Sequence, residues 1–502
     1  MNHCKRTLAL ILTALLAASA VSCGGGDVPA DTTTAADVSG ETTAAPVKEV
    51  PREETPDNLP ALDFKGASVR IHYRGGDDVT KLEIVGEENG DVINDAVFAR
   101  NRSVEERLNV KFDLIPGDSV HEKFMSNLKT VLMSGEDAYD IISAVQWRAL
   151  PQAMEGLYYD LADAPYIDYD APWWYEDYMA EIAVGDERFM LAGDISTTHI
   201  RYMSCLYVNK KIFTDNFGSV DDLYQTVLDG NWTHDKLRKY VSDVYQDLNS
   251  NGVTDEGDLL GISTTPISQA DHICYSAGLR NTGRDAKGMP QLLADQSRNV
   301  KVIETVYNLY YETPGTLIYK SPNEMDGKTL KHFIDSEQLF YPNRFYTAEL
   351  LREMKDPYGM IPMPKLDADQ KDYIALVHDS DTLYCVPITA KSIDMPCAVM
   401  EAMCAENYRT VVPALYDVAL KVKYTQDDIS SQVIDIIHDA AITDFIYANN
   451  YNINASSGSL GTLHRTLLGH GGEPSKDFMS KYDSMKEQVG TIVAKLAEAA
   501  AK

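Results

Sequence analysis

The hydrophobic positions that follow Thr233 repeat with the period of an α-helix. They are spaced by four, three and four residues, which places them on one face of a helix that begins near His234. This apolar face consists of Leu237, Val241, Val244 and Leu248. Thr233 stands at the N-cap position, and Asp235 in the first turn suits the positive end of the helix dipole. The pattern therefore predicts an amphipathic helix that leads into a polar loop.

Apolar segments earlier in the chain alternate between strand and helix patterns. Strands are predicted at residues 68–74, 110–115 and 139–145, with one helix from Asp91 and another over residues 120–133. Such a βαβαβ series predicts a mostly parallel, doubly wound sheet. Further strands are predicted at 188–191, 206–209 and 338–341, and helices at 210–213 and 300–311.

Polar and aromatic residues stand just after two of the predicted strands. Tyr73 and Arg74 end the first strand, and Gln146 and Trp147 follow the third. Ligands of open α/β sheets bind beyond the carboxyl ends of the strands, so we expect these four side chains to line a cleft. Each could equally well have a capping or packing role. Trp147 is the strongest candidate, because an indole at a strand end offers a flat face on which a sugar can stack.

The polar loop after the first helix has the spacing of a calcium-binding loop. Oxygen-bearing side chains occupy positions 1, 3, 5, 9 and 12, and Gly252 stands at position 6, where the chain turns sharply. The side-chain donors are Asp247, Asn249, Asn251, Asp255 and Asp258, and the backbone carbonyl of Val253 would complete the set. The alternative is an ordinary turn rich in Asn, Asp and Gly. Because Asp258 is shorter than the usual Glu and no partner helix follows, we expect a weak, structural calcium site.

The chain begins with two segments that are not expected to join the folded core. Residues 1–22 combine a basic start with a short apolar run, as signal peptides do, and Cys23 follows small residues as in a lipobox. We therefore expect Cys23 to carry lipid and to anchor the protein to the outer face of the cytoplasmic membrane. Residues 24–60 contain almost no large apolar side chains, which predicts a disordered tether.

Composition restricts the classes of partner. A formal net charge of -31 argues against nucleic acid, which requires a basic surface. Beyond Cys23 the chain has an odd number of cysteines in mostly apolar surroundings, which favours buried free thiols over disulfides. They are Cys205, Cys274, Cys385, Cys397 and Cys404. The remaining residues, about 440, are too many for one ordinary core and imply at least two lobes.

Three consecutive motifs resemble family 1 extracellular solute-binding proteins, the capture subunits of ABC importers. The motifs are LYVNKKIF from Leu206, DGNWTHDKL from Asp229 and DLNSNGVTDEGDLLGI from Asp247. The segment ARNRSVEERLNVKF and the C-terminal helices are similar to the same family. The resemblance implies a periplasmic-binding-protein type II fold, α/β, with two lobes that are doubly wound mixed sheets joined by a multi-crossing hinge. Residues 61–197 with 379–412 would form the first lobe, and residues 198–378 with 413–502 the second.

The resemblance also implies further ligand-binding residues. A Pro-Trp-Trp segment precedes the first crossing, and we expect one of Trp173 and Trp174 to face outward. The other implied positions lie at the crossings and on a loop after a second-lobe strand; together with Trp174 they are Thr198, His199, Asn343, Arg344, Asp379 and Asp381. Thr197 is a further hinge-side candidate.

Signs of catalysis are weak. The histidines form no HExxH motif, and no G-x-S-x-G elbow, phosphate loop or GxGxxG follows a predicted strand. We therefore expect a monomeric, membrane-anchored binding protein, not an enzyme, that delivers an oligosaccharide to ABC permease subunits. The many tyrosines favour a sugar, because aromatic rings stack on sugar CH faces. The alternatives are a surface glycan-binding or sensor lipoprotein without a permease, and a glycan-active enzyme.

Overall fold

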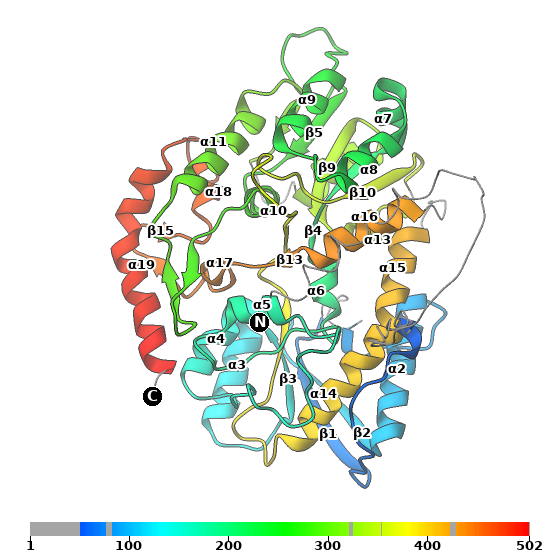
Figure 1. Cartoon of the computed structure of the whole chain (residues 1–502), viewed down its shortest axis with the longest axis vertical. Coiled ribbons are helices and arrows are strands. Elements are labelled where there is room, and N and C mark those ends of the chain that lie inside the picture. Colours follow the sequence, from blue (N-terminus) through cyan, green and yellow to red (C-terminus); the bar gives the residue numbers. More distant parts are fainter. Residues whose placement is uncertain (1–50, 77–82, 321–324, 353, 422–427, 501–502) are drawn as a thin grey trace, which may run out of the picture. The chain divides into compact units, whose positions relative to one another are not determined.

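Two β-sheets, each covered by helices, organise the chain (Figure 1). The computed structural model describes residues 51–76, 83–320, 325–352, 354–421 and 428–500. They belong to the unit Val50–Lys502. The predicted signal peptide, Cys23 and most of the predicted tether therefore lie outside the described residues. The end of that tether, residues 51–60, is not disordered as predicted, because Asp57 pairs with Arg107 at 2.6 Å and with Arg409 at 3.3 Å.

The first sheet has the strand order β12-β3-β1-β2. Its strands are β1 (Ala67–Tyr73), β2 (Val110–Pro116), β3 (Ile141–Val145) and β12 (Thr382–Cys385). β1 is parallel to β2 and to β3, whereas β12 returns from far along the chain and is antiparallel to β3. All five residues of β3 are buried, as expected of a strand in a sheet with both faces covered.

Helices cover both faces of this sheet. α3 (His121–Met133) packs against α4 (Gln146–Met154), and α2 (Val92–Leu108) packs against α14 (Asp394–Glu406) on the other side (Figure 1). α2 starts where predicted, because the side chain of Asp91 accepts hydrogen bonds from the backbone N–H groups of Ile93 and Asn94. α5 (Glu176–Ile182) also belongs to this lobe: its Met179 and Ile182 enclose a small void with Leu150 of α4.

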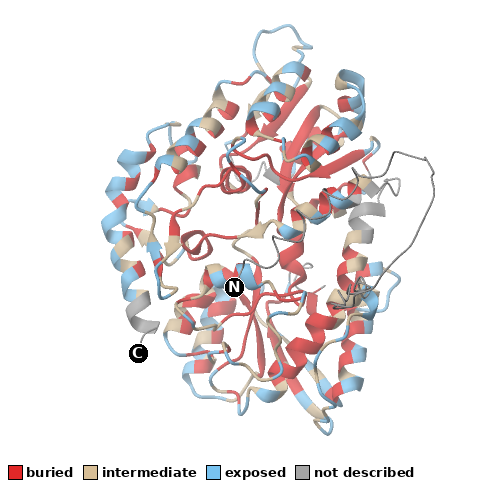
Figure 2. Ribbon diagram, viewed as in Figure 1, coloured by how far each residue is buried: buried red, intermediate tan, exposed pale blue. Residues whose placement is uncertain are grey.

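The second sheet has the order β10-β4-β9-β5-β8. Its strands are β4 (Ser204–Asn209), β5 (Leu260–Thr264), β8 (Thr316–Ile318), β9 (Gln338–Arg344) and β10 (Tyr358–Ile361). β4 is antiparallel to β9 and β10, and β5 is parallel to β8 and β9, so the sheet is mixed. The inner strands of both sheets form the buried centre of each lobe, whereas the edge strands β2 and β8 are only partly buried (Figure 2).

The helices of the second lobe come from two parts of the chain. The first group is α7 (Lys210–Phe217), α8 (Val220–Leu228), α9 (His234–Val244), α10 (Ser268–Ser276), α11 (Ser297–Tyr311), α12 (Leu330–Ile334) and α13 (Thr347–Leu350). The second group is α16 (Asp428–Asp439), α17 (Phe445–Ala448), α18 (Leu463–Leu467) and α19 (Phe478–Ala500). Two short hairpins complete the lobe: β6 (Thr282–Arg284) with β7 (Pro290–Leu292), and β14 (Asn454–Ala455) with β15 (Gly458–Ser459).

The chain passes between the lobes more than once. α6 (Thr197–Arg201) leads from the first lobe into β4, and the segment from β11 (Ala375–Leu376) to β12 leads back. α14 continues through η4 (Asn407–Val411) into α15 (Val412–Lys421), which contacts both α2 and α13. Near these crossings β11 pairs with β13 (Ala441–Ile442). This arrangement confirms the predicted α/β fold with two mixed, helix-flanked sheets and a hinge of several crossings; the exact lobe boundaries stay a prediction.

Two elements predicted from the sequence differ from those in the structure. α9 stops at Val244, so Leu248 is not on its apolar face but is 62% exposed. The reason is tertiary: Gln246 pairs with Leu259, and both backbone hydrogen bonds of that pair draw the chain out of the helix. The strand predicted at 188–191 is also wrong, since only Leu191 is bridged there, to Tyr384 of β12.

The cysteines follow the prediction. Cys205, Cys274, Cys385, Cys397 and Cys404 are all free and buried. Burial raises the pKa of the Cys205 thiol to about 12, so this thiol stays protonated and unreactive.

Among the described residues, no helix is long and apolar enough to cross a membrane.

Candidate functional site

The carboxyl end of β1 places its two predicted residues in the interior of the first lobe. Tyr73 and Arg74 are each 7% exposed, and the Arg74 guanidinium donates a hydrogen bond to the backbone oxygen of Ser119. At the start of α4, Gln146 is 2% exposed and donates through Nε2 to the hydroxyl of Tyr178. These three residues are therefore mostly buried and make contacts within the first lobe at the strand ends.

Trp147 is placed differently, because it touches the second lobe. Its ring lies 4.9 Å from that of Tyr451, and its backbone oxygen accepts a hydrogen bond of 2.6 Å from Nδ2 of Asn452. The Arg148 guanidinium lies 4.7 Å from the Trp147 ring and 3.3 Å from the Tyr451 ring. His121 meets the indole edge-on at 5.9 Å. Trp147 is only partly buried, as the strand-end argument requires of a ligand contact.

Asn343 and Arg344 form the end of β9 rather than a loop after it. Asn343 is buried; its Nδ2 donates to the hydroxyl of Tyr341, and its Oδ1 accepts from the backbone N–H of Arg344. The Arg344 guanidinium lies 5.1 Å from the ring of Tyr202 and 4.9 Å from the ring of Tyr346. Arg344 is only partly buried, so it is the member of this pair that can meet a ligand.

The return crossing brings His378 and Asp379 to the same region. The His378 ring lies 6.2 Å from Tyr202 and 6.1 Å from His272 of α10. Oδ2 of Asp379 accepts a hydrogen bond of 2.6 Å from Nδ2 of Asn450, the residue before Tyr451. Contacts therefore run continuously from Arg344 to Trp147.

We call this group the interlobe site, and it consists of Trp147, Tyr202, Arg344, Tyr346, His378, Asp379, Asn450 and Tyr451. Five of its members are not among the predicted ligand residues. The only sequence signal for Tyr202 and Tyr346 is that each is an aromatic residue within a few positions of a predicted one. Asn450 and Tyr451 carry no such signal.

The electrostatics of the interlobe site are set by burial and by Arg344. Burial first, and then the positive charge of Arg344, lower the pKa of His378 to about 3. Burial, followed by His378 and Arg344, also holds the pKa of His272 well below its usual value. Burial raises the pKa of Asp379. Desolvation opposes charge on all three groups.

Four other predicted residues, Thr197, Thr198, His199 and Asp381, lie inside the hinge. Asp381 is fully buried and accepts hydrogen bonds from the hydroxyls of Ser196 and Thr198, and its Oδ2 lies 2.8 Å from Nδ1 of His199. Thr197 and His199 are buried as well, and the His199 ring stacks on Tyr175 at 4.2 Å. With its carboxylate oxygens occupied in this way, Asp381 holds two crossings together instead of offering an acceptor to solvent.

The expectation that one of the two adjacent tryptophans faces outward is wrong. Trp173 and Trp174 are 2% and 5% exposed, and both indole N–H groups donate to the carboxylate of Glu401, at 3.0 and 2.7 Å. One acidic acceptor in α14 satisfies both indoles, so both rings enter the core of the first lobe. Trp174 is therefore placed as a core residue, away from the interlobe site.

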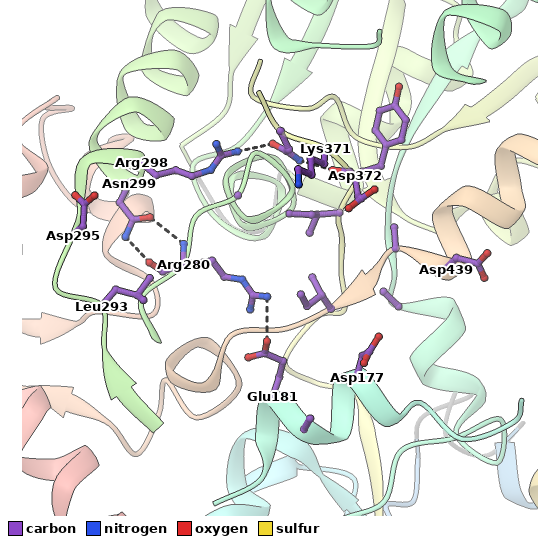
Figure 3. Close-up of a pocket in the computed structure, with 18 residues that line it drawn as sticks. Asp177, Glu181, Arg280, Leu293, Asp295, Arg298, Asn299, Lys371, Asp372 and Asp439 are labelled. Carbon is purple, nitrogen blue, oxygen red and sulfur yellow. Dashed lines mark hydrogen bonds and ion pairs between the residues drawn. The ribbon is translucent and has the colours of Figure 1, made fainter. Parts of the chain in front are cut away.

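A pocket of about 730 Å³ lies elsewhere between α5 and the second lobe (Figure 3). It is lined by residues of α5, the start of α11, the segment 370–374 and β13, and none of the predicted ligand residues lines it. Its polar groups bond one another: Arg280 pairs with Glu181 at 3.2 Å, and Arg298 donates to Gln370. The sequence carried no signal for this pocket, because its walls come from segments far apart in the chain.

The predicted calcium loop is a closed turn that bonds within itself. Asp247 accepts hydrogen bonds from the backbone N–H groups of Asn251 and Gly252, and Gly252 has the positive φ of 76° that its position requires. The other donors are also bonded within the loop: Asn249 and Asn251 donate to Asp255, and Asp258 accepts from Leu248. Val253 is 62% exposed. In the part of the chain that the structure describes, no three His, Cys, Asp or Glu side chains are assembled to hold a metal, so calcium stays a prediction from the spacing.

Comparison with known proteins gives similarity in structure alone. No protein-family model and no curated protein matches the sequence. A cyclo/maltodextrin-binding protein complexed with maltotetraose is 11% identical, with a TM-score of 0.54 over 87% of this chain and 98% of its own. This chain shares the fold of that protein. An ABC substrate-binding protein from Listeria monocytogenes in complex with cycloalternan is 10% identical, with a TM-score of 0.50 over 87% of this chain and 99% of its own.

A third solved structure is the GacH receptor of Streptomyces glaucescens, which was determined without ligand and with acarbose. It is 13% identical, with a TM-score of 0.51 over 86% of this chain and 99% of its own. The described two-lobed fold is thus shared along almost the full length of each of these proteins.

Proposed function

We propose that this chain is an extracellular solute-binding lipoprotein that captures a saccharide between its lobes and delivers it to an ABC importer. The observation that supports this proposal most directly is the interlobe site. There an indole of the first lobe is joined by contacts across the hinge to an arginine, three tyrosines and an asparagine of the second. Aromatic faces and planar polar groups are what a sugar needs for stacking and hydrogen bonds.

Capture would work by closure. A ligand that contacts both lobes stabilises the closed arrangement by the difference between its affinities for the closed and open states. Trp147 and Asp379 already meet residues 450–452 of the second lobe, so a sugar beside them would add contacts to an existing junction. The similarity to proteins solved with maltotetraose and cycloalternan supports an oligosaccharide as the solute.

Three parts of the proposal rest on the sequence. We propose that lipidated Cys23 anchors the mature protein to the outer face of the cytoplasmic membrane, that the loop from Asp247 to Asp258 binds calcium in a structural role, and that the protein acts as a monomer with ABC permease subunits.

A thermal-shift screen of the full-length protein against oligosaccharides tests the capture function. A ligand at about 100 times its dissociation constant should raise the free energy of unfolding by about 2.7 kcal/mol. Calorimetry on each hit should then give one site per chain. A panel of linear and cyclic oligosaccharides that leaves the melting temperature unchanged would contradict saccharide capture.

Delivery needs a separate test. Deletion of the gene should abolish uptake of the saccharide that the purified protein binds, and the wild-type gene should restore it. Normal uptake in the deletion strain would favour a surface glycan-binding or sensor role.

A further inference from the structure

The Arg344 guanidinium is held at the interlobe site by aromatic faces. Tyr202 and Tyr346 flank it at 5.1 and 4.9 Å, and the two tyrosine rings meet each other edge-on at 6.2 Å. A ring face stabilises a cation through its quadrupole but adds no negative charge. The two tyrosines therefore help to position this group, and its positive charge acts on His272 and His378.

Two imidazoles lie next to this arginine. His272 of α10 is fully buried, and neither of its ring nitrogens has a hydrogen-bond partner among the described residues. His378 lies between His272 and Tyr202, with ring centroids 6.1 and 6.2 Å away, and its side chain is 13% exposed. Nδ1 of His378 accepts a hydrogen bond from the backbone N–H of Ser380. His272 has no such partner, and a buried imidazole without one is costly, so His272 indicates that a group from outside the chain completes the hydrogen bonding here.

Positive charges act on both imidazoles, although the whole chain carries a net charge of -31. After burial, Arg344 is the largest charge that acts on His378, and Arg465 and His121 act in the same direction. Asp271 acts in the opposite direction, but it is bound by Arg465 and by His464. Oδ1 of Asp379 lies 3.2 Å from Nδ1 of His378, and its Oδ2 accepts from Asn450. Burial raises the pKa of Asp379, which disfavours its negative charge.

We infer that the solute is an acidic saccharide, whose carboxylate or sulfate group binds beside Arg344, His272 and His378 while its sugar ring stacks on Trp147. This inference rests on the proposed capture function and narrows its substrate class. A guanidinium forms paired, charge-assisted hydrogen bonds with a planar anion, and the imidazoles supply further polar partners. A neutral hydroxyl could also bond to an imidazole, but it would gain nothing from the charge of Arg344.

Calorimetry on the full-length protein with paired probes tests the inference. The carboxylate arm compares oligogalacturonate and oligoglucuronate trimers with their methyl esters, and the sulfate arm compares sulfated galactose trimers with the desulfated trimers. We expect one acidic probe to bind at least tenfold more tightly than its neutral counterpart, which corresponds to about 1.4 kcal/mol. The arm that shows the preference identifies the anionic group. The preference should shrink as salt is raised from 0.05 to about 0.5 M, because salt screens charge.

Variants separate charge from folding. Arg344→Gln should remove the preference for the acidic probe, so that the acidic and neutral probes bind with similar affinity, and Arg344→Lys should keep part of the preference. Arg280→Gln, which removes an arginine from the pocket beside α5, is the matched control and should leave the preference unchanged. If Arg344→Gln does not fold, the salt dependence of the wild-type protein still decides the question.

The outcomes are distinct. Binding of neutral saccharides as tightly as their acidic counterparts would overturn the acidic-solute inference and leave the capture function standing. Absence of binding by every probe, acidic and neutral, would overturn both. An acidic preference that survives in Arg344→Gln would place the anion away from this cluster and would also overturn the inference.

Discussion

At the scale of single residues, Trp147 is the side chain whose role in binding can be tested most directly. Its ring is partly buried and touches Tyr451 of the other lobe. Trp147→Ala should weaken saccharide binding by roughly ten- to a hundredfold, if stacking contributes ~1–3 kcal/mol as it does for bases on aromatic rings. Calorimetry measures the affinity, and thermal melting checks the fold. Trp174→Phe is the control, because it removes a buried hydrogen bond to Glu401 and should lower stability without changing affinity.

A Trp147→Ala protein with normal affinity and a lowered melting temperature would show that the indole serves packing alone.

Glu83 makes a second residue-scale prediction, about pH. It is fully buried and accepts hydrogen bonds from the Tyr384 hydroxyl and from the backbone N–H of Thr198 at the hinge. Burial raises the pKa of this carboxyl from 4.5 to about 7. Between these pH values the folded protein keeps a proton that the unfolded chain releases, so the free energy of unfolding falls as the pH rises through this window. The loss is on the order of 3 kcal/mol.

Urea unfolding at several pH values measures this slope. Glu83→Gln should flatten it in part, because Glu401, whose pKa burial also raises to about 7, retains its own contribution. An identical slope in the wild-type and Glu83→Gln proteins would show that this carboxyl titrates normally.

At the scale of elements, the loop between α9 and β5 carries the calcium prediction. Chelator should lower the melting temperature of protein that has been loaded with calcium, and added calcium should restore it. Asp247→Ala should abolish the difference between the two conditions. The difference is the quantity to follow, because Asp247 also bonds the backbone of Asn251 and Gly252, so this variant loses some stability even without metal. Asp295→Ala, outside the loop, should leave the calcium response intact.

Calcium-loaded protein whose melting is unaffected by chelator would contradict a structural role. Protein that takes up no calcium would contradict the site itself.

At the scale of the whole molecule, two arginines of the second lobe hold the end of α5 in the first. Arg284 of β6 donates to the backbone oxygens of Glu181 and Ala183, and Arg280 pairs with the Glu181 side chain. These bonds can form only while the lobes are close, so they favour closure. Arg284→Gln should enlarge the ligand-free protein in small-angle scattering and weaken saccharide binding by about three- to tenfold. Arg102→Gln, which removes an exposed pair within α2, is the control. Unchanged scattering and affinity in Arg284→Gln would show that the contact does not bias closure.

Membrane attachment is a second prediction at this scale. Cys23→Ser should release the protein into the soluble fraction, because stable anchoring needs covalent lipid or an equivalent apolar anchor. Fractionation with immunoblotting measures the release, and Cys4→Ser, within the predicted signal peptide, is the control. A Cys23→Ser protein that is cleaved normally and yet stays with the membrane would contradict lipidation.

The sequence by itself determined the parts of this protein that depend on local periodicity. The strand and helix order of the first lobe, the apolar face of α9 as far as Val244, and the calcium-type spacing of the following loop are all set by residues a few positions apart. The buried free cysteines also followed from composition and neighbours. Local patterns suffice for these features because the interactions that produce them are local.

Only the tertiary structure determined which side chains and segments pack against one another. Leu248 leaves the helix because Gln246 pairs with Leu259, and Trp174 enters the core because Glu401, 227 residues later, accepts its N–H. The interlobe site joins Trp147 to Tyr451 and Asp379 to Asn450, partners that no local pattern specifies. Strand ends could indicate where ligand-binding residues gather, but which side chains remain accessible there is set by packing between segments hundreds of residues apart.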